Sequence, residues 1–170
     1  MLKMGGLRKH LPWTFATMSV GTLAIAGVPG LAGFFSKDEI LWKAWSNGHP
    51  LVWAALWLGA GMTAFYMFRL LFLTFYGQER MDAHTREHIR ESPRRIVYPL
   101  AALAVLSVVG GYVGLPKWIS PSQPFEHFLE PVLRLPAAQA ASETSGGVEI
   151  LFTALSVLSA AAGIYLAYRI

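Results

Sequence analysis

Long apolar runs, separated by short charged stretches, dominate this sequence. A helix needs about 20 apolar residues to cross the roughly 30 Å core of a bilayer. Three uninterrupted runs meet that length, at residues 51–76, 98–115 and 148–168. A fourth run, 12–46, is interrupted near its middle and carries charges in its second half. The pattern predicts an all-α polytopic membrane protein with four transmembrane helices, the first of them discontinuous.

The basic residues gather in the connections expected on one side of a membrane. Segment 1–11 contains three lysines and arginines and linker 77–97 contains five, whereas the longer linker 116–147 contains two. Loops on the cytoplasmic side of a membrane are enriched in Lys and Arg. We therefore expect 1–11 to be a cytoplasmic loop, 77–97 a cytoplasmic linker and 116–147 a periplasmic linker.

Composition narrows the class of protein further. Hydrophobic residues make up 54% of the chain and charged residues 14%, whereas soluble domains average about 25% charged residues. A soluble globular domain is thereby excluded. The absence of cysteine excludes thiol chemistry and cysteine-ligated zinc or Fe–S clusters. The net charge of +4 does not indicate nucleic-acid binding, because the basic residues flank apolar spans.

The interrupted span contains the most informative chemistry. Its break consists of Pro29, Gly30 and Gly33, and the charged residues Lys37 and Asp38 follow directly. Proline removes a helical hydrogen-bond donor, and glycine tolerates irregular backbone. Broken helices in membranes are tolerated where they are buried in protein or line a wet cavity, and transporters use them at ion sites. Lys37 is therefore a candidate proton carrier, with Asp38 as its acidic neighbour.

Two interpretations of Lys37 remain open at this stage. If 12–46 is one crossing, Pro29 lies at its midpoint and Lys37 about 12 Å further along the helix. A lysine at that depth needs water, a partner or a lost charge. Alternatively, residues 12–35 span the membrane alone and Lys37 is interfacial, with its side chain snorkelling to the surface. Hydropathy does not distinguish the two.

Small residues predict where helices pack closely. Gly110 and Gly114 have the spacing of a small-xxx-small motif. Ser156, Ser159, Ala160 and Gly163 form a small-residue face on the last span. Such faces let membrane helices approach one another closely.

No metal-binding residues are predicted, since His84 and His88 are typical of a solvated helix face.

Three short motifs carry a resemblance to a known family. They are KMGGLRK at residues 3–9, GFFSKDEIL at 33–41 and MTAFYMFR at 62–69. The chain resembles subunit L (chain 5) of the proton-pumping NADH–quinone oxidoreductases, respiratory complex I, most strongly over residues 3–80. The GFFSK motif also suits the related antiporter subunits.

The resemblance implies roles for particular residues. Span 12–46 would be the discontinuous twelfth helix of that subunit, and the following three spans its helices thirteen to fifteen. Lys37 would be the terminal proton relay toward the periplasm, and Asp38 its ion-pair or exit partner. The chain would be a C-terminal-half fragment, with earlier relay residues before Met1 and a lateral helix after Ile170. It would bind no cofactor, because NADH, flavin, Fe–S clusters and quinone belong to partner subunits.

The predicted function is that of a proton-translocating membrane-arm subunit without redox chemistry of its own. It would belong to an oxidoreductase that couples NADH oxidation and quinone reduction to proton pumping. Its expected partners are the other membrane-arm subunits and the lipid bilayer, with no nucleic acid. Its expected location is the bacterial inner membrane rather than the mitochondrial one. The alternatives are a subunit of a multisubunit Na⁺/H⁺ antiporter and a purely structural membrane subunit.

Overall fold

The computed structural model describes residues 4–114, 128 and 146–170, and its regular elements there are all helical. The elements are η1 (Leu7–Lys9), α1 (Pro12–Ala26), α2 (Ala32–Ser46), α3 (Pro50–Phe75), α4 (Ala83–His88), α5 (Arg94–Val109), η2 (Gly110–Gly114) and α7 (Gly146–Arg169). The predicted all-α class is therefore confirmed for the described part of the chain. The predicted linker 116–147 lies almost entirely outside that part.

Among the described residues, three helices are long and apolar enough to cross a membrane. They cover Pro50–Phe75, Arg94–Val113 and Ile150–Arg169. The second begins four residues before the apolar run that starts at Tyr98, because the helix starts directly after Pro93 and includes a charged first turn. Hydropathy identifies the apolar part of a helix but not its polar first turn.

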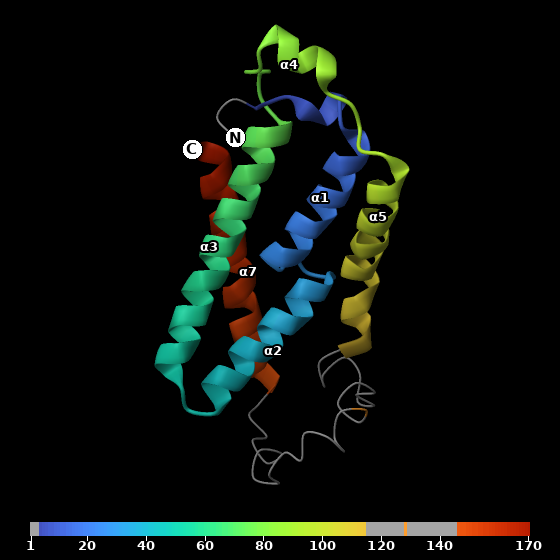
Figure 1. Cartoon of the computed structure of the whole chain (residues 1–170). Coiled ribbons are helices and arrows are strands. Elements are labelled where there is room, and N and C mark those ends of the chain that lie inside the picture. The colour runs from blue at the N-terminus through green and yellow to red at the C-terminus, as the bar shows by residue number, and fades with distance from the viewer. Residues whose placement is uncertain (1–3, 115–127, 129–145) are drawn as a thin grey trace.

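The longer helices α1, α2, α3, α5 and α7 lie roughly along one direction in one bundle (Figure 1). Helices α3 and α7 run side by side and make the most extensive contact, and α1 packs between α3 and α5. Helices α1 and α2 follow one another along the bundle, separated by a short irregular segment (Figure 1). The turn containing η1, together with α4, covers the end of the bundle where α1 begins and α3 ends.

The contact between α3 and α7 depends on small residues. A Cβ atom on Gly163 would lie 2.6 Å from the carbonyl oxygen of Gly61, so the two backbones nearly touch. Ala64 and Ala160 are buried beside them. The packing predicted for Ala160 and Gly163 is therefore confirmed. Further along the same contact, the core contains Phe68, Leu71, Phe75 and Ala167.

The packing predicted for Gly110 is wrong, because nothing lies within 4 Å of a Cβ built there. Its neighbour Gly111 makes the close approach instead, and a Cβ on Gly111 would lie 2.7 Å from Ala32 Cα and 2.6 Å from Phe35 Cδ2. Residues 110–114 form a 3₁₀ helix, whose three-residue turn directs different side chains toward α2 than an α-helix would.

Candidate functional site

The break begins where a left-handed glycine ends α1. Gly27 has φ +83° and donates its N–H to the Ala24 carbonyl at 3.0 Å, while Val28 N–H bonds the Leu23 carbonyl at 3.1 Å. This pair of bonds is the Schellman arrangement that commonly closes helices. The sequence prediction of the break omitted Gly27, although a glycine followed two residues later by proline is a helix-end signal.

A tight turn then connects the two half-helices. Pro29 and Gly30 occupy its central positions, and Gly30 has φ +90°. The Leu31 N–H closes the turn on the Val28 carbonyl at 3.3 Å. Proline followed by a glycine of positive φ is the signature of a type II turn. Two of the three residues predicted to break the helix thus build the connection between α1 and α2.

The third predicted break residue, Gly33, lets the half-helices cross. A Cβ on Gly33 would overlap the Ala24 carbonyl, lying 2.9 Å from its carbon and closer still to its oxygen. Because the obstructing atoms are backbone atoms, a side chain at this position would separate the first turn of α2 from the last turn of α1. Gly33 therefore permits the backbone contact between α1 and α2.

Lys37 binds a carbonyl group that this break leaves without a helical partner. In a continuous helix the Ile25 carbonyl would accept the N–H of residue 29, but that residue is proline and has none. The Lys37 Nζ donates to the Ile25 carbonyl oxygen at 2.5 Å. The negative end of the α1 dipole also favours a cation at this position. The proline thus provides the acceptor for the lysine.

Asp38 faces a different helix from Lys37. Successive residues of an α-helix point about 100° apart, and Asp38 is directed toward α7. There the side chains of Thr153 and Ser156 lie near its carboxylate, while the Ser156 hydroxyl donates to the Phe152 carbonyl at 3.1 Å. Sequence reasoning identified Ser156 only as a packing residue and did not select Thr153. Their i, i+3 spacing places both hydroxyls on one face of α7.

A small cavity adjoins both charged side chains. The space open to the centre of a water molecule is about 10 Å³, close to the lower limit for holding one water. The cavity lies about halfway along the bundle, because its lining includes Ala60, near the middle of α3, and Ser156, near the middle of α7. Lys37 and Asp38 are the charged residues of its lining, which also includes Ala26, Gly27, Phe34 and Leu41.

The remaining charges of α2 lie further from the break. Glu39 and Lys43 form an i, i+4 ion pair with 2.8 Å between Oε1 and Nζ, and the lysine side chain is 57% exposed. Lys43 therefore differs from Lys37 in position and exposure while belonging to the same helix. This difference makes Lys43 a useful control for experiments on Lys37.

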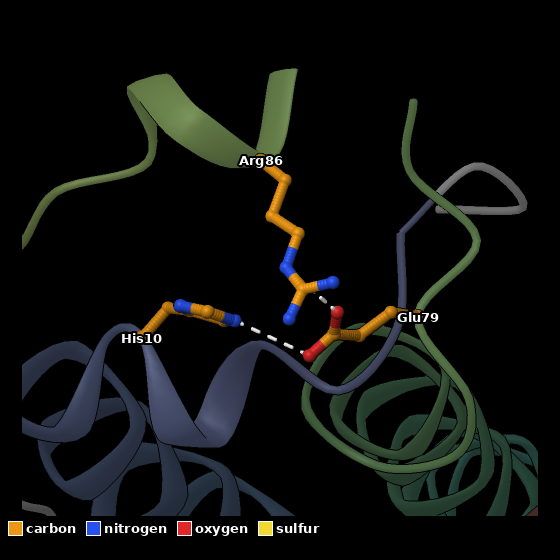
Figure 2. Close-up of polar contacts among 3 residues, drawn as sticks. All are labelled: His10, Glu79 and Arg86. Atoms are coloured by element: carbon orange, nitrogen blue, oxygen red, sulfur yellow. Dashed lines mark hydrogen bonds and ion pairs between the residues drawn. The ribbon is translucent and has the colours of Figure 1, made fainter. Parts of the chain in front are cut away.

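A second polar cluster lies at the end of the bundle near η1 and α4. The two carboxylate oxygens of Glu79 lie 3.2 Å from His10 Nε2 and 3.3 Å from Arg86 Nε. Figure 2 shows both side chains pointing toward this carboxylate. The cluster joins the segment before α1 to the linker after α3. His84 and His88 stack at 4.7 Å between ring centroids, and no group of three potential metal ligands occurs among the described residues.

Glu91 caps the first turn of α1 from the same linker. Its carboxylate accepts the Trp13 N–H at 2.8 Å and the Thr14 hydroxyl at 2.6 Å. Slight burial acts to raise the pKa of Glu91, but the hydrogen bonds from Thr14, Trp13 and Ser92 outweigh it and hold the pKa below its usual value. Glu91 is therefore charged at neutral pH, and a negative charge near a helix N-terminus stabilises the helix.

Comparison with known proteins identifies one family and several relatives, and the relatives are all described as NADH- or NAD(P)H-quinone oxidoreductase proteins. Residues 1–63 match a family described as the transmembrane part of NADH:quinone oxidoreductases and Mrp antiporters. The chain is 48% identical to NADH-quinone oxidoreductase subunit L of Rhodobacter capsulatus, over 66% of this chain and 17% of that protein. It is 46% identical to NAD(P)H-quinone oxidoreductase chain 5 of a Picosynechococcus species, over 68% of this chain and 20% of that protein.

A mycobacterial relative is similar over a larger share of the chain. NADH-quinone oxidoreductase subunit L of Mycobacterium tuberculosis is 43% identical over 78% of this chain and 20% of its own length. The chain thus spans about a fifth of the length of the curated relatives it matches. The resemblance identified from the sequence motifs is confirmed.

Proposed function

Because the chain is homologous to subunit L (chain 5) of NADH–quinone oxidoreductases, we propose that it is a proton-translocating segment of such a subunit. The observation that carries the proposal is the helix break, where Lys37 binds the Ile25 carbonyl beside a small cavity. A cation held at a broken helix inside an apolar bundle is an arrangement that ion-translocating proteins use.

The proposal includes four membrane crossings. Helices α1 and α2 have 15 residues each, which gives each a length of about 22 Å. Either half alone is shorter than the roughly 30 Å core of a bilayer, so the two halves together make one crossing. With α3, α5 extended by η2, and α7, the total is four. Lys37 then lies inside the membrane rather than at its surface.

The sidedness of the proposal follows from the basic residues. Segments 1–11 and 77–97 face the cytoplasm, and segment 116–147 faces the periplasm. The lipid surrounding the bundle is the bacterial inner membrane. The partners are the other membrane-arm subunits, and the subunits that bind NADH, flavin, Fe–S clusters and quinone perform the redox chemistry.

The role of Lys37 in this proposal is to hold and release one proton at Nζ. As an ammonium it donates to the Ile25 carbonyl and lies next to the Asp38 carboxylate in sequence. A change in the surroundings that favours the neutral amine releases the proton, and the reverse change takes one up. Redox energy from partner subunits would shift the balance between these two states. The chain contributes the lysine, its backbone acceptor and the small cavity beside them.

A second candidate function is cation/proton exchange in an Mrp-type antiporter. The family matched by residues 1–63 includes those antiporters by description. Such a protein would use the same broken helix and lysine, but it would need no redox partner. A purely structural membrane subunit is the third possibility, and in that case Lys37 would be replaceable.

Purification of the assembly that contains this chain tests the proposal. We expect a tagged protein with this sequence to copurify with flavin and Fe–S subunits and to show NADH-dependent quinone reduction. Reconstituted vesicles should acidify when NADH is supplied. Na⁺-driven proton movement without NADH oxidation would instead establish the antiporter. Proton pumping unaffected by Lys37→Ala would leave the structural role.

A further inference from the structure

Two hydroxyl groups of α1 lie inside the bundle and have no hydrogen-bond partner among the described residues. They are Ser19 Oγ and Thr22 Oγ1, both shielded from solvent, and Thr22 as a whole is 1% exposed. By contrast, the hydroxyls of Thr63, Ser107 and Ser156 donate to the carbonyl one turn earlier on their own helices. A buried hydroxyl without a partner costs about 1–3 kcal/mol. The pair is therefore suited to bind a polar ligand that is not part of the chain.

Both hydroxyls lie on the face of α1 that packs against α3. Phe15 and Ala26 come before and after them on this face. The Phe15 ring lies 5.2 Å from that of Phe75 on α3, centroid to centroid, and Ala26 is buried in the core shared with α3. Successive helical residues point about 100° apart, which places Ser19 and Thr22 within about 40° of both around the helix axis. The two residues form a hydroxyl strip in an otherwise apolar helix contact.

The hydroxyl strip ends at the Lys37 site. Ala26, one turn after Thr22, lines the cavity that adjoins Lys37, and Lys37 Nζ donates to the Ile25 carbonyl. Along the axis of α1, Thr22 lies about 4.5 Å before Ile25, and Ser19 a further 4.5 Å or so before Thr22. A water molecule that is hydrogen-bonded on both sides spans about 5.5 Å between its partners. Single water molecules are therefore long enough to connect these steps.

We propose that Ser19 and Thr22 bind water between α1 and α3 and pass protons between this water and Lys37. This inference rests on the proposed function and adds a route of proton supply to it. A hydroxyl both accepts hydrogen bonds and donates one proton. It takes a proton from a water on one side while it gives its own proton to a water on the other. The water next to Lys37 then protonates the neutral Nζ, so that one proton has moved and neither hydroxyl carries a charge.

The position of the strip gives this supply a direction. From Lys37 the strip runs along α1 toward the end of the bundle covered by η1 and α4 (Figure 1), which faces the cytoplasm in the proposed sidedness. Phe15 has the next position on this face, and its ring packs against Phe75 at 5.2 Å and Tyr76 at 5.8 Å between centroids. An aromatic contact therefore separates water at the strip from the cytoplasm.

The test is NADH-driven proton pumping by the complete assembled complex in vesicles, with variants that distinguish hydroxyl chemistry from packing. Thr22→Val keeps the shape of the side chain and removes the hydroxyl, whereas Thr22→Ser keeps the hydroxyl and removes a methyl group. We expect the double variant Ser19→Ala with Thr22→Val to show most of the pumping loss of Lys37→Ala. Thr22→Ser should pump as wild type. If the two residues only pack, the order reverses, because the serine leaves a space and the valine does not.

Thermal stability of the assembly is the second readout. Removal of an unpaired buried hydroxyl without a change of shape is neutral or stabilising, so Thr22→Val should unfold at or above the wild-type temperature while it pumps less. A purely structural role would change stability and pumping together. Ser107→Ala and Thr63→Val are matched controls, since these hydroxyls already bond carbonyls within their own helices. Both should keep wild-type pumping.

The outcomes separate this inference from the proposed function. If Lys37→Ala lowers pumping but the double variant pumps as wild type, the inference is overturned and the proposed function stands. If Lys37→Ala pumps normally, the proposed function fails and the inference fails with it. Should the double variant not assemble, Thr22→Val alone is compared with Thr22→Ser, and equal pumping by these two overturns the inference as well.

Discussion

Single charged residues in this chain bind groups that are distant in sequence. Glu91 caps α1 through Trp13 and Thr14, and Glu79 joins His10 to Arg86. Both carboxylates belong to the linker after α3, and both hold the segment that begins α1. At the residue scale, this linker therefore fixes where α1 enters the bundle.

Replacement of Glu91 should loosen the first turn of α1. A lost cap costs about 1 kcal/mol, so Glu91→Ala should accelerate amide hydrogen exchange in that turn roughly fivefold at neutral pH. The measurement is hydrogen exchange with mass spectrometry on the assembled protein. Equal exchange in variant and wild type would show that the cap contributes nothing.

The Glu91 contribution also has a defined pH dependence. Its pKa is lowered in the folded protein, so the stabilisation is present above the unfolded value of about 4.3. It is lost as the pH falls through the lower folded value. Protection of the first turn in wild type should therefore decrease under acid conditions, whereas Glu91→Gln should lack this acid-dependent step. An identical acid response in both proteins would contradict the assignment.

The Glu79 cluster should affect the linker more than global stability. Partly exposed ion pairs contribute about 0.2–1 kcal/mol each, so Glu79→Ala should change the unfolding temperature little. Limited proteolysis within residues 77–93 should become several-fold faster, because His10 and Arg86 lose a shared partner. High salt should reproduce much of this effect in wild type by screening. Glu87→Ala, which removes a charge from α4, is the control and should not change cleavage.

At the scale of elements, the sequence predicted the helix break from Pro29, Gly30 and Gly33, and these residues do form the turn and the crossing between α1 and α2. Local chemistry sufficed because a type II turn and a helix crossing each require specific residues. The partner of Lys37 could not be predicted, because the Ile25 carbonyl becomes available only in the folded turn. Gly110 was misassigned because hydropathy does not distinguish a 3₁₀ helix from an α-helix.

Gly33→Ala tests the crossing of the two half-helices. The added methyl group would overlap backbone atoms of Ala24, so α2 must move away from α1 and Lys37 from its carbonyl acceptor. We expect loss of most NADH-driven pumping together with lower thermal stability of the assembly. Gly21→Ala on α1 is the control, since nothing lies within 4 Å of its added Cβ and alanine favours helices. Wild-type pumping by Gly33→Ala would contradict the account of the crossing.

At the scale of the whole molecule, apolar length and charge pattern predicted the long helices, and the described part of the chain contains three of them that could cross a membrane. Their mutual arrangement could not be read from the pattern. Ser156 lies more than a hundred residues from Asp38, and three-dimensional packing alone brings both to the lining of one cavity. The site is therefore a property of the bundle and not of the broken helix by itself.

In the proposed function, Lys37 carries a translocated proton. The most direct measurement is the number of protons moved per electron by the assembled complex in sealed vesicles, with Lys37→Met compared with Lys43→Met. Both substitutions remove one positive charge from α2, but only Lys37 binds the carbonyl at the break. We predict a lower ratio for Lys37→Met and a wild-type ratio for Lys43→Met. Equal, wild-type ratios for both variants would contradict the account.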